Sequence, residues 1–126
     1  MVRERISTTN APGAIGPYSQ AIRAEGRLLF MSGQVCLTPG GELVKGTITE
    51  QTQQVMANMR GVLEEAGLSF ANIVKTTVFL SSMDHFAEMN AVYGSFFETD
   101  PPARSTVAVL GLPRGVDVEI EAIAVY

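Results

Sequence analysis

The C-terminal segment 116–125 constrains the fold most strongly, because its apolar residues occupy both faces of a predicted strand. Side chains alternate between the two faces along a strand. One face carries Val118, Ile120, Ala122 and Ala124, and the other carries Ile123 and Val125 beside Glu119 and Glu121. A sheet that is apolar on both faces needs cover on both. If the helices of this chain cover one face, a second subunit is expected to cover the other.

Strand patterns recur along the rest of the chain. Strands are predicted at 28–35, 73–80, 103–110 and 116–125, with two shorter candidates at 19–24 and 3–7. We expect 19–24 to pair with 28–35 around a turn at 25–27. The pair Ser32-Gly33 interrupts strand 28–35, and a glycine at such a position is typical of a β-bulge or of close approach to the backbone.

Two helices are predicted between these strands. The first begins at a capping box formed by Thr47 and Glu50, and it ends before Gly67, a residue type favoured in the left-handed position after a helix. The second begins at Ser82 or Asp84. Its apolar stripe consists of Phe86, Met89, Tyr93, Phe96 and Phe97. Because each helix lies between two strands, both are expected on one face of a mixed sheet, in a single α+β domain that spans 1–126.

The composition favours a small homo-oligomer. Charged residues make up 17% of the 126 residues and apolar residues 46%. About 25% charged is usual, so part of the surface is expected to be buried between subunits. The net charge of −4 opposes a duplex nucleic-acid binder, because such proteins have a basic face. A single cysteine and an N-terminus without the apolar run of a secretory signal favour a cytoplasmic location, and no apolar run approaches the length of a membrane helix.

Metal and nucleotide cofactors are not expected. Zinc takes about four nitrogen or sulfur ligands, and His85 and Cys36 have no companions at ligand spacing. His85 is expected to be a solvated surface residue and Cys36 a small buried apolar one. The P-loop pattern and G-x-G-x-x-G are both absent from the sequence.

Four residues, three on or near predicted strands and one on the second predicted helix, are candidates for a binding site. Arg104 follows two prolines at the start of a strand, where its planar guanidinium would suit a carboxylate or phosphate, or would lie in solvent. Glu119 lies in the middle of a strand, where a carboxylate must be paired, protonated or functional, and residue type alone favours structural pairing. Asn90 could make a buried hydrogen bond or a ligand contact, and Tyr18 could pack or form an aromatic wall.

Six segments together resemble the RidA/YjgF family of small trimeric enamine/imine deaminases. They are APGAIGPYSQA (11–21), SGQV (32–35), KTTVFL (75–80), FAEMNAVYGSFF (86–97), PPARSTV (101–107) and LPRGVDVEIEAIA (112–124). Each one alone is a weak signal, but six in this order and spacing are highly specific. The resemblance extends over about residues 5–126 without large insertions.

The resemblance implies a chorismate-mutase-like fold and a homotrimer with active sites in the clefts between subunits. It implies that Arg104 binds the substrate carboxylate and that Glu119 holds or activates water. The other residues that it places beside the ligand are Tyr18, Ser32, Gly33, Asn90 and Thr106. Thr106 stands where many members have cysteine, at a position that contributes mainly backbone contacts.

The activity implied by the resemblance is hydrolysis of short 2-imino acids, released by pyridoxal-phosphate enzymes, to 2-keto acids and ammonia, without a metal or organic cofactor. A regulatory trimer that binds a small carboxylate without turnover is the alternative. The excess of acidic over basic residues and the absence of tryptophan argue against action on RNA. Chorismate mutase activity has only fold analogy in its favour.

Overall fold

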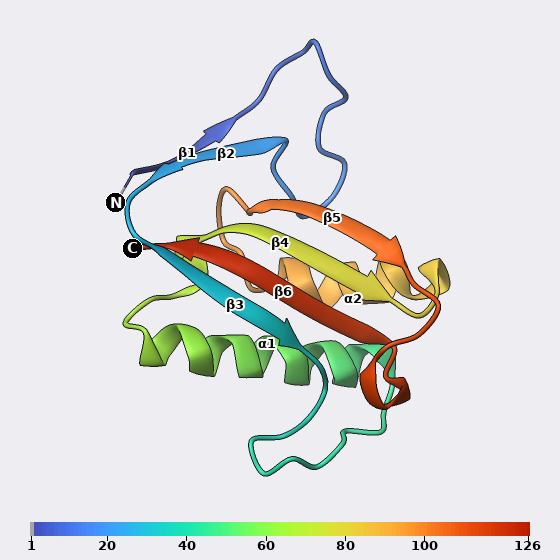
Figure 1. Ribbon diagram of the computed structural model, residues 1–126. Coiled ribbons are helices and arrows are strands. Elements are labelled where there is room, and N and C mark those ends of the chain that lie inside the picture. Colours follow the sequence, from blue (N-terminus) through green and yellow to red (C-terminus); the bar gives the residue numbers. More distant parts are fainter. Residues whose placement is uncertain (1) are drawn as a thin grey trace.

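The computed structural model describes residues 2–126, which form a four-stranded sheet, two helices and a separate pair of strands (Figure 1). The strands are β1 (Val2–Ile6), β2 (Ala21–Glu25), β3 (Leu28–Gln34), β4 (Ile73–Leu80), β5 (Ala103–Ala108) and β6 (Val118–Val125). The helices are α1 (Ile48–Glu65) and α2 (Phe86–Gly94), and the short 3₁₀ turns are η1 (Phe70–Asn72), η2 (Met83–His85) and η3 (Pro113–Gly115). The predicted order of strands and helices is confirmed.

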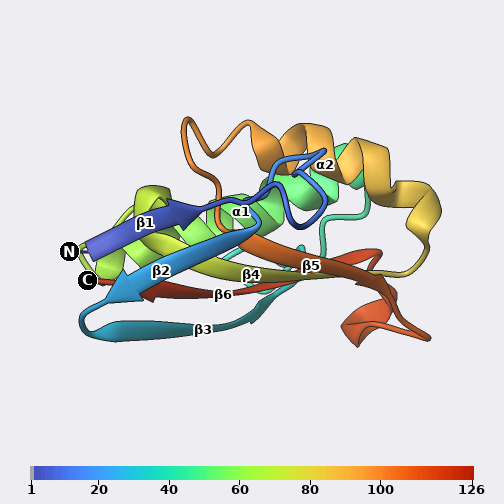
Figure 2. The same cartoon turned by 90° about the horizontal axis from the view of Figure 1, so that it is seen from above.

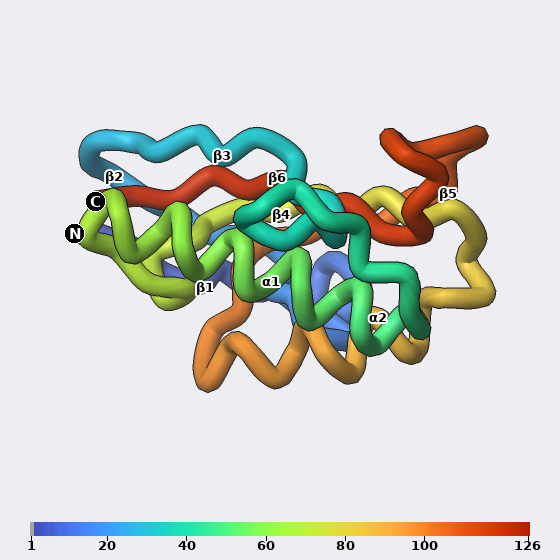
Figure 3. The backbone as a smooth tube through the Cα atoms, turned by 90° about the horizontal axis from the view of Figure 1, so that it is seen from below, coloured from blue at the N-terminus to red at the C-terminus, as the bar shows by residue number. Residues whose placement is uncertain are grey.

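The large sheet is mixed and has the strand order β3-β6-β4-β5. β4 and β5 are parallel, and β6 is antiparallel to both β3 and β4. Both helices lie on one face of this sheet (Figure 2), and they lie side by side (Figure 3). The prediction of an α+β fold with two helices on one face of a mixed sheet is therefore confirmed.

The first helix begins and ends where its sequence signals predict. The backbone N–H of Glu50 donates to Thr47 Oγ1, and that of Thr47 donates to Glu50 Oε1, both at 3.2 Å. This capping box satisfies backbone groups that the start of a helix leaves unpaired. Gly67 follows the helix with φ of 77°. The inward face of α1 contributes Val55, Met56, Met59 and Leu63 to the core between the helices and the sheet.

The N-terminal strands depart from the prediction. β2 pairs antiparallel with β1 and not with β3, so the two strands that flank the predicted turn belong to different sheets. The backbone turns between them at Gly26, where φ is 136°, and β3 then pairs with β6. Arg3 links the small sheet to the large one, because its Nε donates to the carbonyl of Ile73 at 2.9 Å.

Several element ends also differ from the prediction. Ser82 caps η2, where its Oγ accepts from the N–H of Asp84 at 3.1 Å, and α2 follows directly. Phe96 and Phe97 lie beyond α2 and pack on Phe70, with ring centroids 5.2 and 5.7 Å away. β5 ends at residue 108 and not at 110. β6 begins at residue 118 and not at 116, after the turn η3.

The second face of the large sheet is left bare by residues 2–126 (Figure 2). Phe30 pairs with Ile123 on this face, and Phe30 is 71% exposed. Leu28 and Val107 are also among the large exposed apolar side chains. The prediction that this chain covers only one face of its sheet is therefore confirmed. What covers the other face stays a prediction.

Candidate functional site

Arg104 lies at the start of β5, where a backbone hydrogen bond just before it and a side chain of α2 hold it in place. The N–H of Ser19 donates to the carbonyl of Pro102 at 3.1 Å, which fixes the chain just before the arginine. Arg104 Nη1 donates to Asn90 Oδ1 on α2 at 2.7 Å. The arginine is therefore a positioned side chain and not a freely solvated strand end.

Three aromatic rings surround the guanidinium. Its central carbon lies 5.0 Å from the ring centre of Tyr93 and 5.7 Å from those of Tyr18 and Phe86. Cations over aromatic faces are attracted by the ring quadrupole. Tyr93 is itself fixed, because its hydroxyl lies 2.8 Å from Thr76 Oγ1, and burial raises the pKa of Tyr93 to about 12. The tyrosine therefore stays neutral at physiological pH.

The guanidinium of Arg104 has no carboxylate partner among residues 2–126. The ion pairs in this part of the chain are Arg5 with Asp100, Arg23 with Glu4, and His85 beside Asp117. Burial lowers the pKa of Arg104, while the nearby Tyr93 and Tyr18 act in the opposite direction. A partly desolvated cation that lacks a counter-ion is a favourable partner for an anion.

Glu119 lies in the middle of β6 and fits against a glycine. A Cβ built on Gly33 would lie 2.1 Å from Glu119 Oε2, so a side chain at position 33 would displace the carboxylate. The pairing of β3 with β6 is irregular between Met31 and Gln34, which is the bulge predicted at Ser32-Gly33. The bulge and the glycine thus make room for the glutamate.

Arg104 and Glu119 lie on opposite faces of the large sheet. Arg104 pairs with Thr76 on β4, and Glu119 pairs with Phe79. Positions 76 and 79 are an odd number of residues apart, so their side chains point to opposite faces. The predicted site residues therefore form two groups. Arg104, Asn90, Tyr18 and Thr106 belong to the helix side, and Glu119, Ser32 and Gly33 belong to the bulge of β3 and the bare face.

A family model described as "Endoribonuclease L-PSP" matches residues 8–126. The chain belongs to this family, the RidA/YjgF family. The 2-iminobutanoate/2-iminopropanoate deaminase of Mus musculus is 48% identical over 126 residues, which cover 99% of this chain and 93% of the mouse protein. YyfB from Yersinia pestis, a Rid family protein of unknown function, has a TM-score of 0.91 and 34% identity with 100% of both chains covered. E. coli TdcF, solved with bound serine, has a TM-score of 0.76 and 41% identity, with 98% of each chain covered.

In this RidA/YjgF chain, two residues that contact Arg104 are not predicted as site residues from the sequence, and with Arg104, Asn90, Tyr18 and Thr106 they form what we call the Arg104 group. Phe86 and Tyr93 are predicted only as members of the apolar stripe of the second helix. Together with Asn90 they stand at positions i, i+4 and i+7, which place all three on one helix face. An amide within an otherwise apolar face is the signal that indicates a polar partner opposite it, and Arg104 is that partner.

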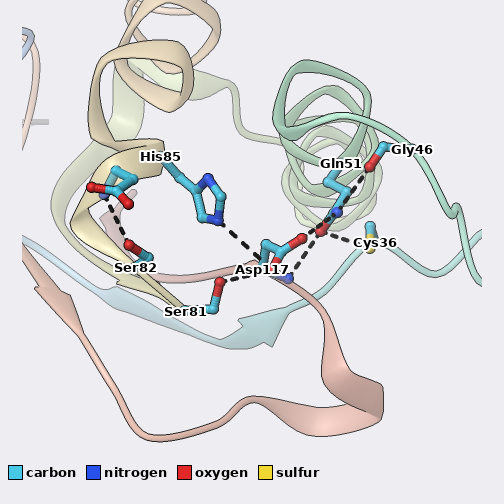
Figure 4. A network of polar contacts seen from close by, with 8 residues as sticks. Cys36, Gly46, Gln51, Ser81, Ser82, His85 and Asp117 are labelled. Carbon is cyan, nitrogen blue, oxygen red and sulfur yellow. Dashed lines mark hydrogen bonds and ion pairs between the residues drawn. The ribbon is translucent and has the colours of Figure 1, made fainter.

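A polar network outside both groups joins α1 to the start of β6 (Figure 4). Asp117 accepts hydrogen bonds from Ser81 Oγ at 2.7 Å and from Gln51 Nε2 at 2.9 Å, which together lower its pKa. His85 Nε2 lies 3.8 Å from Asp117 Oδ1, and Cys36 Sγ lies 3.6 Å from Gln51 Oε1. Ser81 donates to the aspartate and not to the histidine, so these residues do not form a nucleophilic triad.

His85 is half-buried beside Asp117, which corrects the prediction of a solvated side chain. The prediction of a buried Cys36 is confirmed. Among residues 2–126, no group of three or more histidine, cysteine, aspartate or glutamate side chains is arranged to hold a metal ion. Within the same residues, none of the helices has the length and apolar character needed to cross a membrane.

Proposed function

We propose that this protein hydrolyses short 2-imino acids, such as 2-iminopropanoate and 2-iminobutanoate, to 2-keto acids and ammonia. The observation that carries the proposal is the partly buried guanidinium of Arg104, which contacts an amide and three aromatic rings but no carboxylate among residues 2–126. Such a group favours a small anionic ligand. The activity of the mouse relative and the serine bound to TdcF support a substrate that carries a carboxylate.

The proposed chemistry needs a positioned water and a proton acceptor. An imine carbon is already electrophilic, so a covalent nucleophile is not required. The water oxygen bonds to the imine carbon while the nitrogen gains a proton, which gives a tetrahedral aminol. The hydroxyl proton of the aminol is then transferred to the nitrogen, the C–N bond breaks, ammonia leaves and the keto group forms. Arg104 holds the carboxylate throughout, and Glu119 takes the proton of the attacking water and returns it to the nitrogen.

The two groups of site residues support an active site shared between subunits. Because Arg104 and Glu119 lie on opposite faces of one sheet, one chain does not bring them to the same substrate. A homotrimer would bring the Arg104 group of one subunit against the bare face of the next, where Glu119 and the bulge at Ser32-Gly33 lie. The exposed Phe30 on that face supports the same packing.

The first test is a coupled assay. A pyridoxal-phosphate dehydratase generates 2-aminoacrylate from serine, and the loss of the imine is followed with and without this protein. We expect the wild type to accelerate this loss. Arg104→Ala should lose about 100-fold or more in kcat/KM, because a charged hydrogen-bonding partner of the substrate is removed. Arg23→Ala, which removes an exposed arginine from a surface ion pair with Glu4, is the matched control. A wild-type rate equal to the buffer rate would rule out this substrate.

Binding without turnover is the second candidate, because the Arg104 group is complete within one chain. Glu119→Gln distinguishes the two functions. The deaminase loses turnover in this variant and keeps its affinity for a 2-keto acid. A carboxylate sensor has no turnover to lose, and removing the negative charge would leave its affinity equal or higher.

RNA is a third candidate substrate, through the descriptions of the family model and of two similar solved structures as endoribonucleases. The net charge of −4 and the absence of tryptophan oppose it. Salt-dependent binding or cleavage of a single-stranded RNA by the purified protein would reverse this inference. We place the protein in the cytoplasm, because its lone Cys36 suits a reducing compartment.

A further inference from the structure

The turn that leads into β5 contains a residue in an unfavourable conformation. Asp100 has φ of 44°, in the left-handed region that is uncommon for residues other than glycine. Pro101 follows it, and a residue before proline favours an extended backbone. Strained residues persist only where their surroundings hold them, and they cluster at functional sites. The contacts that hold Asp100 therefore bear on the position of Arg104, four residues along the chain.

Arg3, on β1, holds this turn against the large sheet. Its Nη2 donates to the carbonyl of Asp100 at 2.8 Å, and its Nε donates to the carbonyl of Ile73, the first residue of β4, at 2.9 Å. One half-buried guanidinium therefore joins the turn before β5 to the start of β4, the strand with which β5 pairs. Because the guanidinium is a rigid planar fork, its two hydrogen bonds fix both the distance and the direction between these backbone segments.

The other contacts of this turn are weaker or lie after the strained residue. Arg5 Nε lies 3.4 Å from Asp100 Oδ1, but both side chains are more than half exposed, and an exposed ion pair contributes little. Ser19 holds the two prolines that follow, because its Oγ donates to the carbonyl of the first and its N–H donates to that of the second. Ser19 thus fixes the chain after Asp100, and Arg3 fixes Asp100 itself.

We propose that Arg3 is a positioning residue for Arg104: by holding the strained turn at Asp100 against β4, it sets where β5 begins and where the guanidinium of Arg104 lies. This inference rests on the proposed function for the role of Arg104. Without Arg3, the turn is free to relax toward the extended backbone that a residue before proline favours, and the start of β5 shifts with it. A displacement of about 1 Å at a residue that places the substrate can cost an enzyme about 100-fold.

The test measures the dissociation constant of pyruvate by calorimetry, and KM and kcat with 2-aminoacrylate, in variants of Arg3. We expect Arg3→Met to raise the dissociation constant and KM by about tenfold, as a smaller displacement of Arg104 would. The change in kcat should stay below about threefold, because Arg104 binds the carboxylate in the ground state and the transition state alike. Arg3→Lys keeps the charge and loses the planar fork, so it should raise both constants by about three- to tenfold.

Arg23→Ala is the matched control for these variants. It removes another arginine of the same small sheet, from an exposed ion pair with Glu4, and it leaves the turn at Asp100 untouched. Its dissociation constant and KM should stay within about twofold of the wild type. The melting temperature of each variant is measured as well, and Arg3→Lys supplies the comparison if Arg3→Met does not fold.

A second substitution separates positioning from a merely structural role. Glycine adopts the left-handed conformation without strain, so Asp100→Gly added to Arg3→Met should recover part of the lost affinity. If Arg3 only stabilised the fold, an added glycine would loosen the chain further and the affinity would fall or stay low. Rescue by Asp100→Gly therefore supports the role of Arg3 in holding the strained turn, and its absence contradicts that role.

The outcomes also separate this inference from the deaminase itself. Wild-type affinity and KM in a folded Arg3→Met variant would overturn the positioning role and leave the deaminase proposal standing. A wild type that binds pyruvate without turnover would overturn the deaminase, and a weaker affinity in Arg3→Met would still support the positioning of Arg104. A wild type that does not bind pyruvate would overturn the positioning role, because Arg104 would then hold no carboxylate.

Discussion

The lack of a counter-ion at Arg104 can be tested by supplying one. Asn90 Oδ1 already lies 2.7 Å from the guanidinium, so Asn90→Asp places a carboxylate where the amide is, with almost no change in shape. The new charge should pair with Arg104 and compete with the substrate carboxylate. We expect KM to rise by about 10- to 100-fold, the value of a charge-assisted hydrogen bond, with no loss of thermal stability. Asn10→Asp adds the same charge at an exposed position and should leave KM unchanged. An unaltered KM in Asn90→Asp would contradict anion binding at Arg104.

At the scale of single residues, the sequence provides candidate residues but not the contacts between them. Arg104 and Asn90 are both predicted, but their contact depends on how α2 lies across β5, which is a tertiary property. Tyr93 is predicted as an apolar packing residue because its spacing fits the stripe, although it also lies beside Arg104. The separation of Glu119 from Arg104 depends on the register of β4 with both of its neighbours, and one sequence does not reveal that register.

At the scale of elements, the bulge in β3 positions Glu119. Gly33→Ala would place a Cβ 2.1 Å from Glu119 Oε2, 2.9 Å from its Cδ and 3.1 Å from its Cγ. The end of a glutamate side chain can rotate away, so we expect a folded protein with a melting temperature near that of the wild type. The displaced carboxylate should lower kcat with little change in the affinity for 2-keto acids. Gly61→Ala, in the last turns of α1, is the control, because an added Cβ there would meet no atom within 4 Å. It should keep kcat and gain about 0.5–1 kcal/mol of stability. A wild-type kcat in Gly33→Ala would contradict the role given to Glu119.

The elements that the sequence predicts well are those with local signals. The capping box at Thr47 and the glycine at position 67 lie within the helix they delimit, so their effect does not depend on the rest of the fold. The partner of β2 is a different case. A short strand next to a turn suggests a hairpin with β3, but the pairing is decided by β1, about twenty residues away in the sequence. Local patterns therefore predict that a strand forms, but not which strand it pairs with.

At the scale of the whole molecule, a shared active site makes a quantitative prediction for mixed subunits. Arg104→Ala and Glu119→Gln are each expected to be inactive alone. When equal amounts are refolded together, about one quarter of the clefts in a randomly assembled trimer would combine an intact Arg104 from one subunit with an intact Glu119 from the next. We therefore expect about one quarter of the wild-type activity to return, measured per total subunit. A site built within one chain would regain none.

A second mixture checks the estimate of one quarter. It should retain activity whether the site is shared between subunits or lies within one chain, but in different amounts. The double variant Arg104→Ala/Glu119→Gln is refolded with an equal amount of wild type. If each cleft needs two adjacent intact subunits, about one quarter of the activity remains, whereas a site within one chain would retain about one half. Mixing the folded proteins without refolding gives about one half in either case, which calibrates the assay. One quarter in both refolded mixtures, from a species with the mass of a trimer, would establish that the bare face of one sheet completes the Arg104 site of its neighbour.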